Sequence, residues 1–165
     1  MSFPGLVIMG VSGCGKSHLG RALAAALPNA IFIEGDELHP PANIAKMSQG
    51  IPLTDADRAG WLADVGRAIA HGRQTHLTVA SCSALRRTYR ETLLSISPGL
   101  HFFHLHGERP LLLQRLQTRT HFMPPSLLDS QLATLEPPDP ATEPATILDC
   151  TLPLEVLVGM IVESF

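Results

Sequence analysis

The chain has 165 residues, of which 45% are hydrophobic, and a formal net charge of −3. This length suits one domain with a substantial core, and the slightly acidic balance excludes a chain-wide basic surface for nucleic acid. No apolar run is long enough to cross a membrane, and three widely spaced cysteines are typical of reduced thiols rather than of a disulfide framework. We therefore expect one cytoplasmic domain, residues 1–165, that binds neither nucleic acid nor membrane.

Strands and helices alternate along the chain, as judged from hydrophobic periodicity and from glycine and proline signals. Strands are expected at 5–10, 30–34, 76–81, 100–106 and 145–149. Helices are expected at 16–27, about 40–48, 54–71, 83–95, 109–118, 126–135 and 153–164, with Thr54 as the cap of the third. This alternation predicts an α/β fold, a parallel sheet with helices on both faces and functional loops at the carboxyl ends of its strands.

A glycine-rich motif follows the first apolar run. Residues 10–17 read G-V-S-G-C-G-K-S, which matches the P-loop pattern G-x-x-x-x-G-K-[ST] between a strand and a helix. The glycines free backbone N–H groups to surround phosphate oxygens, Lys16 adds a charge for the β- and γ-phosphates, and the Ser17 hydroxyl can ligate Mg²⁺. The sequence therefore predicts a site for ATP and Mg²⁺ formed by Gly10, Ser12, Gly13, Cys14, Gly15, Lys16, Ser17 and His18.

The P-loop alone does not separate GTPases, ATPase motors and small-molecule kinases. The chain has no Asn-Lys-x-Asp to read guanine and no apolar strand that ends in Asp-Glu, as a motor would need; residues 57–60 match D-x-x-G but open a helix. A small-molecule kinase needs a carboxylate beside the P-loop to accept a proton from, or orient, the attacking hydroxyl. Asp36, after the second strand, is our candidate, and capping of the next helix is the alternative role.

Several long segments resemble the gluconokinase family. They are Gly35-Asp36-x-x-His39-Pro40, the run from Asn43 to Leu62, the run from Cys82 to Arg90, and residues 121–138. The resemblance implies transfer of the γ-phosphate of ATP to the 6-hydroxyl of D-gluconate. It also implies a P-loop NTPase fold with an adenylate-kinase-like sheet of five parallel strands in the order 2-3-1-4-5, a short lid, and a homodimer.

The substrate implied by this resemblance carries a carboxylate and a row of hydroxyls. Arginine and lysine can hold the carboxylate, and histidine can donate to or accept from a hydroxyl. We predict an acceptor-binding segment at about 35–60, with substrate contacts from Asp36, His39, Lys46, Arg58, Cys82, Ser83, Arg90 and His121. Surface ion pairing is the alternative role for Arg58, and core packing is our prediction for Trp61 and Tyr89.

A lid is predicted at about 115–126. Charge spreads over the γ-phosphoryl oxygens during transfer, which favours arginines on a closing loop. Arg115 and Arg119 are four residues apart on one helix face, and with Lys16 and Asp36 they form our predicted catalytic set; a role as helix-surface arginines is the alternative. Gluconokinases typically read Arg-x-Gly-His-Phe here, whereas residues 119–122 read R-T-H-F, one glycine shorter.

Two other functions remain open at this point. A kinase for adenylylsulfate also places Gly-Asp after the second strand, but that family carries Phe-Ile-Ser-Pro after the third strand, where residues 82–85 read C-S-A-L. A nucleotide-binding module without turnover is the other alternative, if the shortened lid does not close. Release of ADP in the presence of gluconate separates an enzyme from a module.

Overall fold

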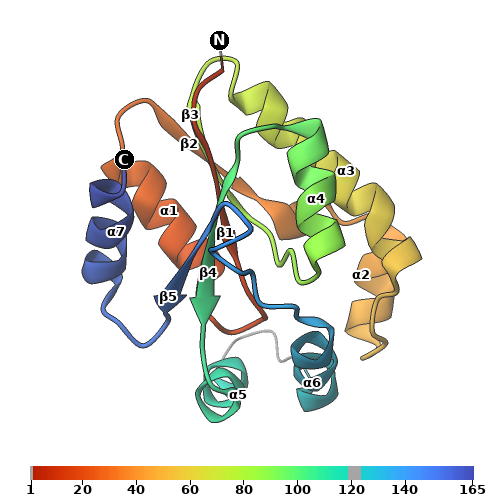
Figure 1. The fold of residues 1–165 in the computed structure, drawn as a ribbon. Coiled ribbons are helices and arrows are strands. Elements are labelled where there is room, and N and C mark those ends of the chain that lie inside the picture. Colours follow the sequence, from red (N-terminus) through yellow and green to blue (C-terminus); the bar gives the residue numbers. More distant parts are fainter. Residues whose placement is uncertain (1, 119–123) are drawn as a thin grey trace.

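A computed structural model of the chain, which describes residues 2–118 and 124–165, has the predicted α/β architecture (Figure 1). One sheet contains β1 (Gly5–Met9), β2 (Ala30–Glu34), β3 (Leu77–Ser81), β4 (His101–His106) and β5 (Ala145–Asp149). The strands lie in the order β2-β3-β1-β4-β5, and each neighbouring pair is parallel. This confirms the predicted order, and it brings all carboxyl ends to one edge of the sheet.

Helices cover both faces of this sheet. They are α1 (Lys16–Ala26), the short 3₁₀ helix η1 (Gly35–Leu38), α2 (Pro41–Ser48), α3 (Asp55–Gly72), α4 (Arg87–Ile96), α5 (Arg109–Gln117), α6 (Pro125–Thr134) and α7 (Leu154–Glu163). Figure 1 shows α1 and α7 on one face and α3 and α4 on the other, with α5 and α6 beyond the carboxyl ends of the strands. Among the described residues, no helix combines the length and apolarity that a membrane span requires.

Local sequence explains how α3 begins. The Thr54 hydroxyl accepts a hydrogen bond from the Asp57 backbone N–H at 3.1 Å, and the Asp57 carboxylate accepts one from the Thr54 N–H at 2.9 Å. This capping box satisfies two backbone donors that a helix start leaves free. The predicted Thr54 cap is confirmed, and the helix buries Arg58, Trp61, Leu62, Val65 and Ile69 on one face.

One helix begins later than predicted. The sequence favoured a helix from Ser83, but α4 begins at Arg87 because residues 83–86 form a loop in which Ala84 has a φ of 46°, the left-handed region. The loop packs against the P-loop, where Gly10 N–H donates to Ser83 O at 3.3 Å. Ser83 is therefore presented at the carboxyl edge of the sheet instead of on a helix.

Candidate active site

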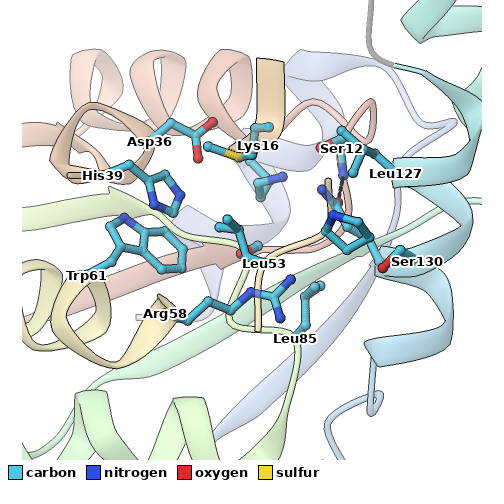
Figure 2. Close-up of a pocket in the computed structure, with 14 residues that line it drawn as sticks. Ser12, Lys16, Asp36, His39, Leu53, Arg58, Trp61, Leu85, Leu127 and Ser130 are labelled. Carbon is cyan, nitrogen blue, oxygen red and sulfur yellow. Dashed lines mark hydrogen bonds between the residues drawn. The ribbon is translucent and has the colours of Figure 1, made fainter. Parts of the chain in front are cut away.

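A cavity of about 170 Å³ lies at the carboxyl edge of the sheet (Figure 2). Segments far apart in sequence enclose it: the P-loop, η1, α3, the loop after β3, and α6. The polar side chains that line it come from Ser12, Lys16, Asp36, His39, Arg58, Ser83, Ser130 and Gln131. The fold thus brings two residues of the predicted phosphate site and four of the predicted acceptor site around one cavity: Ser12, Lys16, Asp36, His39, Arg58 and Ser83.

The P-loop has the backbone that its glycines predict. Gly13 and Gly15 have φ angles of 88° and 98°, a region that L side chains rarely adopt. The Lys16 ammonium donates to Val11 O at 3.1 Å and so lies back across the loop. A smaller cavity of about 50 Å³ is lined by Ser12, Gly13, Gly15, Lys16, Ser17 and Asp36. Backbone donors, an ammonium and a hydroxyl therefore converge where phosphates would lie.

Asp36 shares both cavities with Lys16. It lies on η1, directly after β2, and its side chain is exposed. The N-caps of η1 and α2 are Glu34 and Pro40, and neither helix has a side-chain capping bond. Helix capping is therefore not the role of Asp36. Its carboxylate is available to a hydroxyl near the phosphate site.

His39 is buried in the wall of the cavity, in a defined protonation state. Its Nδ1 lies 3.2 Å from the Nδ2 of Asn43, which also donates to Asp57 O at 2.9 Å. An amide nitrogen only donates, so Nδ1 is an acceptor and the remaining proton is on Nε2. Burial lowers the pKa of His39, and the nearby Arg58 lowers it further, although Asp36 raises it. A neutral imidazole that can donate from Nε2 results.

Trp61 is a site residue that the sequence reasoning assigned only to the core. It is buried, yet its indole lines the cavity and stacks on the His39 ring with centroids 4.1 Å apart. Its Nε1–H donates to the Gly35 carbonyl at 2.8 Å, next to Asp36. Its helical spacing predicted burial correctly, but the spacing could not indicate which strand end the ring would meet.

Arg58 places a positive charge at the cavity. Its side chain is only 6% exposed, and its Nη1 donates to the Tyr89 hydroxyl at 3.2 Å, which in turn donates to Asp55. Within residues 2–118 and 124–165, no carboxylate oxygen lies within 4.0 Å of its guanidinium nitrogens. A buried guanidinium that faces a cavity without a direct ion pair is suited to an anionic ligand.

Three predicted substrate contacts lie elsewhere. Arg90 is 1% exposed, forms an ion pair with Glu143 at 2.7 Å, and donates to the carbonyls of residues 84, 85 and 136. Lys46 donates to the Asp57 carboxylate at 2.7 Å, outside the cavity lining. Cys82 is buried, which raises the pKa of its thiol to about 12. In the structure, Arg90 and Lys46 are therefore already paired with Glu143 and Asp57.

A second cavity, of about 400 Å³, is lined in part by the P-loop. Arg115 reaches into it from α5 and donates to Cys14 O at 3.3 Å and to Cys150 O at 3.0 Å. Its lining residues are Gly13, Cys14, Gly15, His18, Leu19, Leu105, Arg115, Cys150, Leu152, Leu154 and Leu157. The predicted site residues Arg119 and His121 lie outside the described residues.

Curated relatives and a solved structure that share 46–51% identity with this chain are gluconokinases. A scan against protein-family models finds no match. The chain is 51% identical over 140 residues to a gluconokinase of Gluconobacter oxydans (strain 621H). The aligned region covers 81% of this chain and 75% of that protein. It is 46% identical over 142 residues to the thermosensitive gluconokinase of Escherichia coli (strain K12), over 84% and 74% of the two chains.

A solved structure agrees with these relatives in sequence and in shape. The crystal structure of a gluconokinase from Sinorhizobium meliloti 1021 superposes with a TM-score of 0.83 at 47% identity, over 99% of this chain and 97% of the other. Identity at this level over four fifths of the chain, together with the shared fold and P-loop, extends well beyond the nucleotide motif. This chain belongs to the gluconokinase family.

Proposed function

We propose that this protein transfers the γ-phosphoryl group of ATP to the 6-hydroxyl of D-gluconate, giving ADP and 6-phospho-D-gluconate. The observation that carries this assignment is the single cavity that joins Lys16 and Asp36, at the P-loop, to Arg58, which lacks a direct ion pair. Phosphate chemistry at one end and an anion site at the other match an acceptor with a hydroxyl and a carboxylate at opposite ends. Identity of 51% to a gluconokinase supports the same substrate.

ATP would lie across the P-loop. Its phosphates would meet the backbone N–H groups of 13–17, the Lys16 ammonium and the N-terminal end of α1. The second cavity suits the nucleoside, because leucines 152, 154 and 157 offer apolar surface. Gly10, Ser12, Cys14 and His18 complete the nucleotide site in this proposal.

Mg²⁺ fits the smaller cavity by the chemistry of its donors. The Ser17 hydroxyl lines that cavity, and Mg²⁺ prefers oxygen ligands together with phosphate oxygens. No cluster of three His, Cys, Asp or Glu side chains suited to a metal occurs among the described residues, so the ion would bind largely through the nucleotide. When bound, it would neutralise charge on the phosphates.

Gluconate would bind with its carboxylate at Arg58 and its far end near Lys16. Arg90 and Lys46 are held by Glu143 and Asp57, so of the three cations predicted from the sequence Arg58 is the one that lines the cavity. The His39 Nε2–H can donate to a hydroxyl along the chain of the substrate. This orientation leaves the 6-hydroxyl beside Asp36.

The transfer then follows an in-line course. The 6-oxygen of gluconate forms a bond to the γ-phosphorus while the bond from phosphorus to the β–γ bridging oxygen breaks, and the hydroxyl proton passes to Asp36. Lys16 stabilises the charge on the phosphoryl oxygens. Arg115 and Arg119 would add their guanidinium charges as the lid segment 115–126 closes, which would also exclude water and limit hydrolysis.

We also propose a cytoplasmic homodimer. All three cysteines are free and buried, which suits a reducing compartment.

Exposed apolar side chains at Ile147 on edge strand β5 and at Val156 and Met160 on α7 offer a surface for a second copy. Light scattering after gel filtration should give twice the chain mass of 17.8 kDa, and a monomer would refute this part of the proposal.

A coupled ADP-release assay tests the proposed function. Purified protein with ATP and Mg²⁺ is offered D-gluconate, other sugar acids, shikimate and adenylylsulfate, and steady turnover is expected with gluconate. The Lys16→Ala variant should fold but release no ADP, which excludes a contaminating kinase. Turnover with adenylylsulfate alone would assign a different acceptor, and ATP binding without turnover on any acceptor would leave a nucleotide-binding module.

A further inference from the structure

We infer that Gln131 of α6 contacts the acceptor, and that its side-chain NH₂ donates a hydrogen bond to a hydroxyl of the acceptor's polyol chain. The inference rests on the proposed gluconate kinase function and adds a specificity-determining residue to the same site. Sequence reasoning gave Gln131 no chemical role, since it lies 119 residues away from the P-loop residue that it contacts.

The P-loop backbone orients the Gln131 side chain. The Ser12 N–H donates to the Gln131 Oε1 at 2.8 Å, the dashed bond beside Ser12 in Figure 2. A backbone N–H only donates, so the carbonyl end of the amide must face Ser12 and the NH₂ end must face away. In the described part of the chain, that NH₂ makes no hydrogen bond to protein and is not among the fully shielded polar atoms without a partner. Its donors are therefore open to a molecule in the cavity.

The helix that carries Gln131 is held in place at its carboxyl end. Just beyond α6, the Glu136 N–H donates to Leu85 O at 2.7 Å, and the Glu136 carboxylate accepts from the Arg87 N–H at 3.0 Å. Arg90 donates to the Glu136 carbonyl at 2.9 Å. These bonds tie α6 to the loop after β3, which supplies Ser83 and Leu85 to the cavity. The loop after β3, which lines the cavity, thus helps to hold Gln131 in position.

The position of Gln131 favours the acceptor over the phosphates. Gln131 lines the cavity that holds His39 and Arg58, whereas the lining of the smaller phosphate cavity includes Lys16 and Asp36 but not Gln131. The Asp36 carboxylate can only accept hydrogen bonds, and Arg58 offers a full charge. Gln131 therefore adds a neutral donor, which suits the oxygen of a hydroxyl. Because the same amide braces Ser12, a bound acceptor is placed directly relative to the P-loop.

The Gln131→Glu variant tests this inference. Glutamate keeps an oxygen for the Ser12 N–H and nearly the same size, but it replaces the NH₂ donor with an anionic oxygen that repels an anionic acceptor. KM for gluconate should rise at least about tenfold, while KM for ATP should change less than about twofold and the thermal midpoint should stay unchanged. Gln74→Glu, an exposed residue outside the site, adds the same charge and should behave as wild type.

A second variant distinguishes a hydrogen bond from Gln131 to the acceptor from a purely structural role of Gln131 in supporting the P-loop. Gln131→Met and wild type are compared on gluconate and on analogues that each lack one hydroxyl, as a double-mutant cycle. On the wild-type enzyme, kcat/KM for one of these analogues should be about tenfold lower than kcat/KM for gluconate. On Gln131→Met, kcat/KM for the same analogue should equal kcat/KM for gluconate. An equal loss on every acceptor, or an equal rise in KM for ATP and gluconate in Gln131→Glu, would reduce Gln131 to a brace of the P-loop and overturn the inference.

Failure of the proposed function would be visible separately. Wild-type ADP release with gluconate is measured first, and its absence refutes the kinase assignment before any variant is compared. Calorimetry of gluconate binding to wild type and Gln131→Glu then decides the inference alone. Weaker binding by at least about tenfold in the variant supports it, and equal or absent binding in both proteins overturns it.

Discussion

The indole of Trp61 stacks on the imidazole of His39, with ring centroids 4.1 Å apart and planes inclined by 14°. The same indole donates from Nε1 to the Gly35 carbonyl at 2.8 Å. One buried aromatic residue on α3 therefore holds both ends of the segment that carries Asp36. The catalytic carboxylate in our proposal is positioned by the hydrophobic core as much as by its own loop.

The Trp61→Phe variant should separate the hydrogen bond from the stacking. Phenylalanine keeps an aromatic face for His39 but removes the hydrogen bond from the indole to the Gly35 carbonyl, a loss of about 0.5–1.5 kcal/mol. We expect the free energy of unfolding, measured in urea, to fall by that amount, and kcat to fall about tenfold as the Asp36 segment loosens. An unchanged kcat at reduced stability would show that this bond only supports the fold.

The Asp36→Asn variant tests the proton acceptor. The amide cannot take the hydroxyl proton, so kcat should drop about 10²–10⁴-fold, as is typical when a general base is removed. The Kd for ATP, measured by calorimetry, should change little. Glu37→Gln, which neutralises the exposed neighbouring carboxylate, is the matched control and should retain wild-type turnover. Equal effects of the two substitutions would contradict the assigned role.

Arg58→Gln and Arg90→Gln should fail in different ways. Arg58 faces the cavity, so its replacement should raise KM for gluconate by about 30-fold or more through loss of a charged contact of about 2–5 kcal/mol. Arg90 is paired with the largely buried Glu143, whose carboxylate would lose the guanidinium, so the free energy of unfolding should fall by about 3–5 kcal/mol. Steady-state kinetics and urea titration of both variants check this. A normal KM in Arg58→Gln would place the carboxylate elsewhere.

Stability should depend on pH through His104, which is buried in β4 with an Nδ1 that has no hydrogen-bond partner among the described residues. Burial is the main cause that lowers the pKa of His104 from 6.5 to about 4. Between these values the unfolded chain binds more protons than the folded chain. The stability present above pH 6.5 is therefore lost as the pH falls toward 4.

This part of the pH dependence can be measured directly. For one such group the free energy of unfolding should decrease by about 2 kcal/mol between pH 7 and pH 5. His104→Leu should remove that part of the slope. The exposed His71→Gln, on α3, should not change it. The pH dependence of the unfolding free energy that remains in His104→Leu comes from His39 and His101, because burial also lowers their pKa values. Identical slopes in wild type and His104→Leu would show that His104 is not responsible.

Gly35→Ala should damage both fold and site. A Cβ at Gly35 would lie 2.1 Å from the Ser81 carbonyl oxygen, which is backbone and cannot move aside cheaply. We expect a loss of about 1–3 kcal/mol in unfolding free energy and of most turnover, since Asp36 follows directly. Gly60→Ala is the matched control: nothing lies within 4 Å of its added Cβ, and alanine in a helix interior should stabilise by up to about 1 kcal/mol. Tolerance of Gly35→Ala would contradict the close approach.

The sequence by itself determined the features that depend on near neighbours. The P-loop motif at residues 10–17, the Thr54 cap of α3 and the strand order implied by the family resemblance all hold in the structure. Each of the first two needs only a few consecutive residues, whose backbone conformation and hydrogen bonds are local. The place of Asp36 beside Lys16 was predicted the same way, because parallel strands bring their carboxyl ends to one edge of the sheet; its catalytic role stays a prediction.

Only the tertiary structure decided which side chains are free to meet a ligand. Arg58 and Arg90 read alike in sequence, but Glu143, 53 residues further along the chain, pairs with Arg90 and leaves Arg58 at the cavity. Gln131 meets Ser12 across 119 residues. Whether a charged or amide side chain is bonded to other protein groups or can bind a ligand depends on which distant segment folds beside it. That is a property of packing, which no local pattern contains.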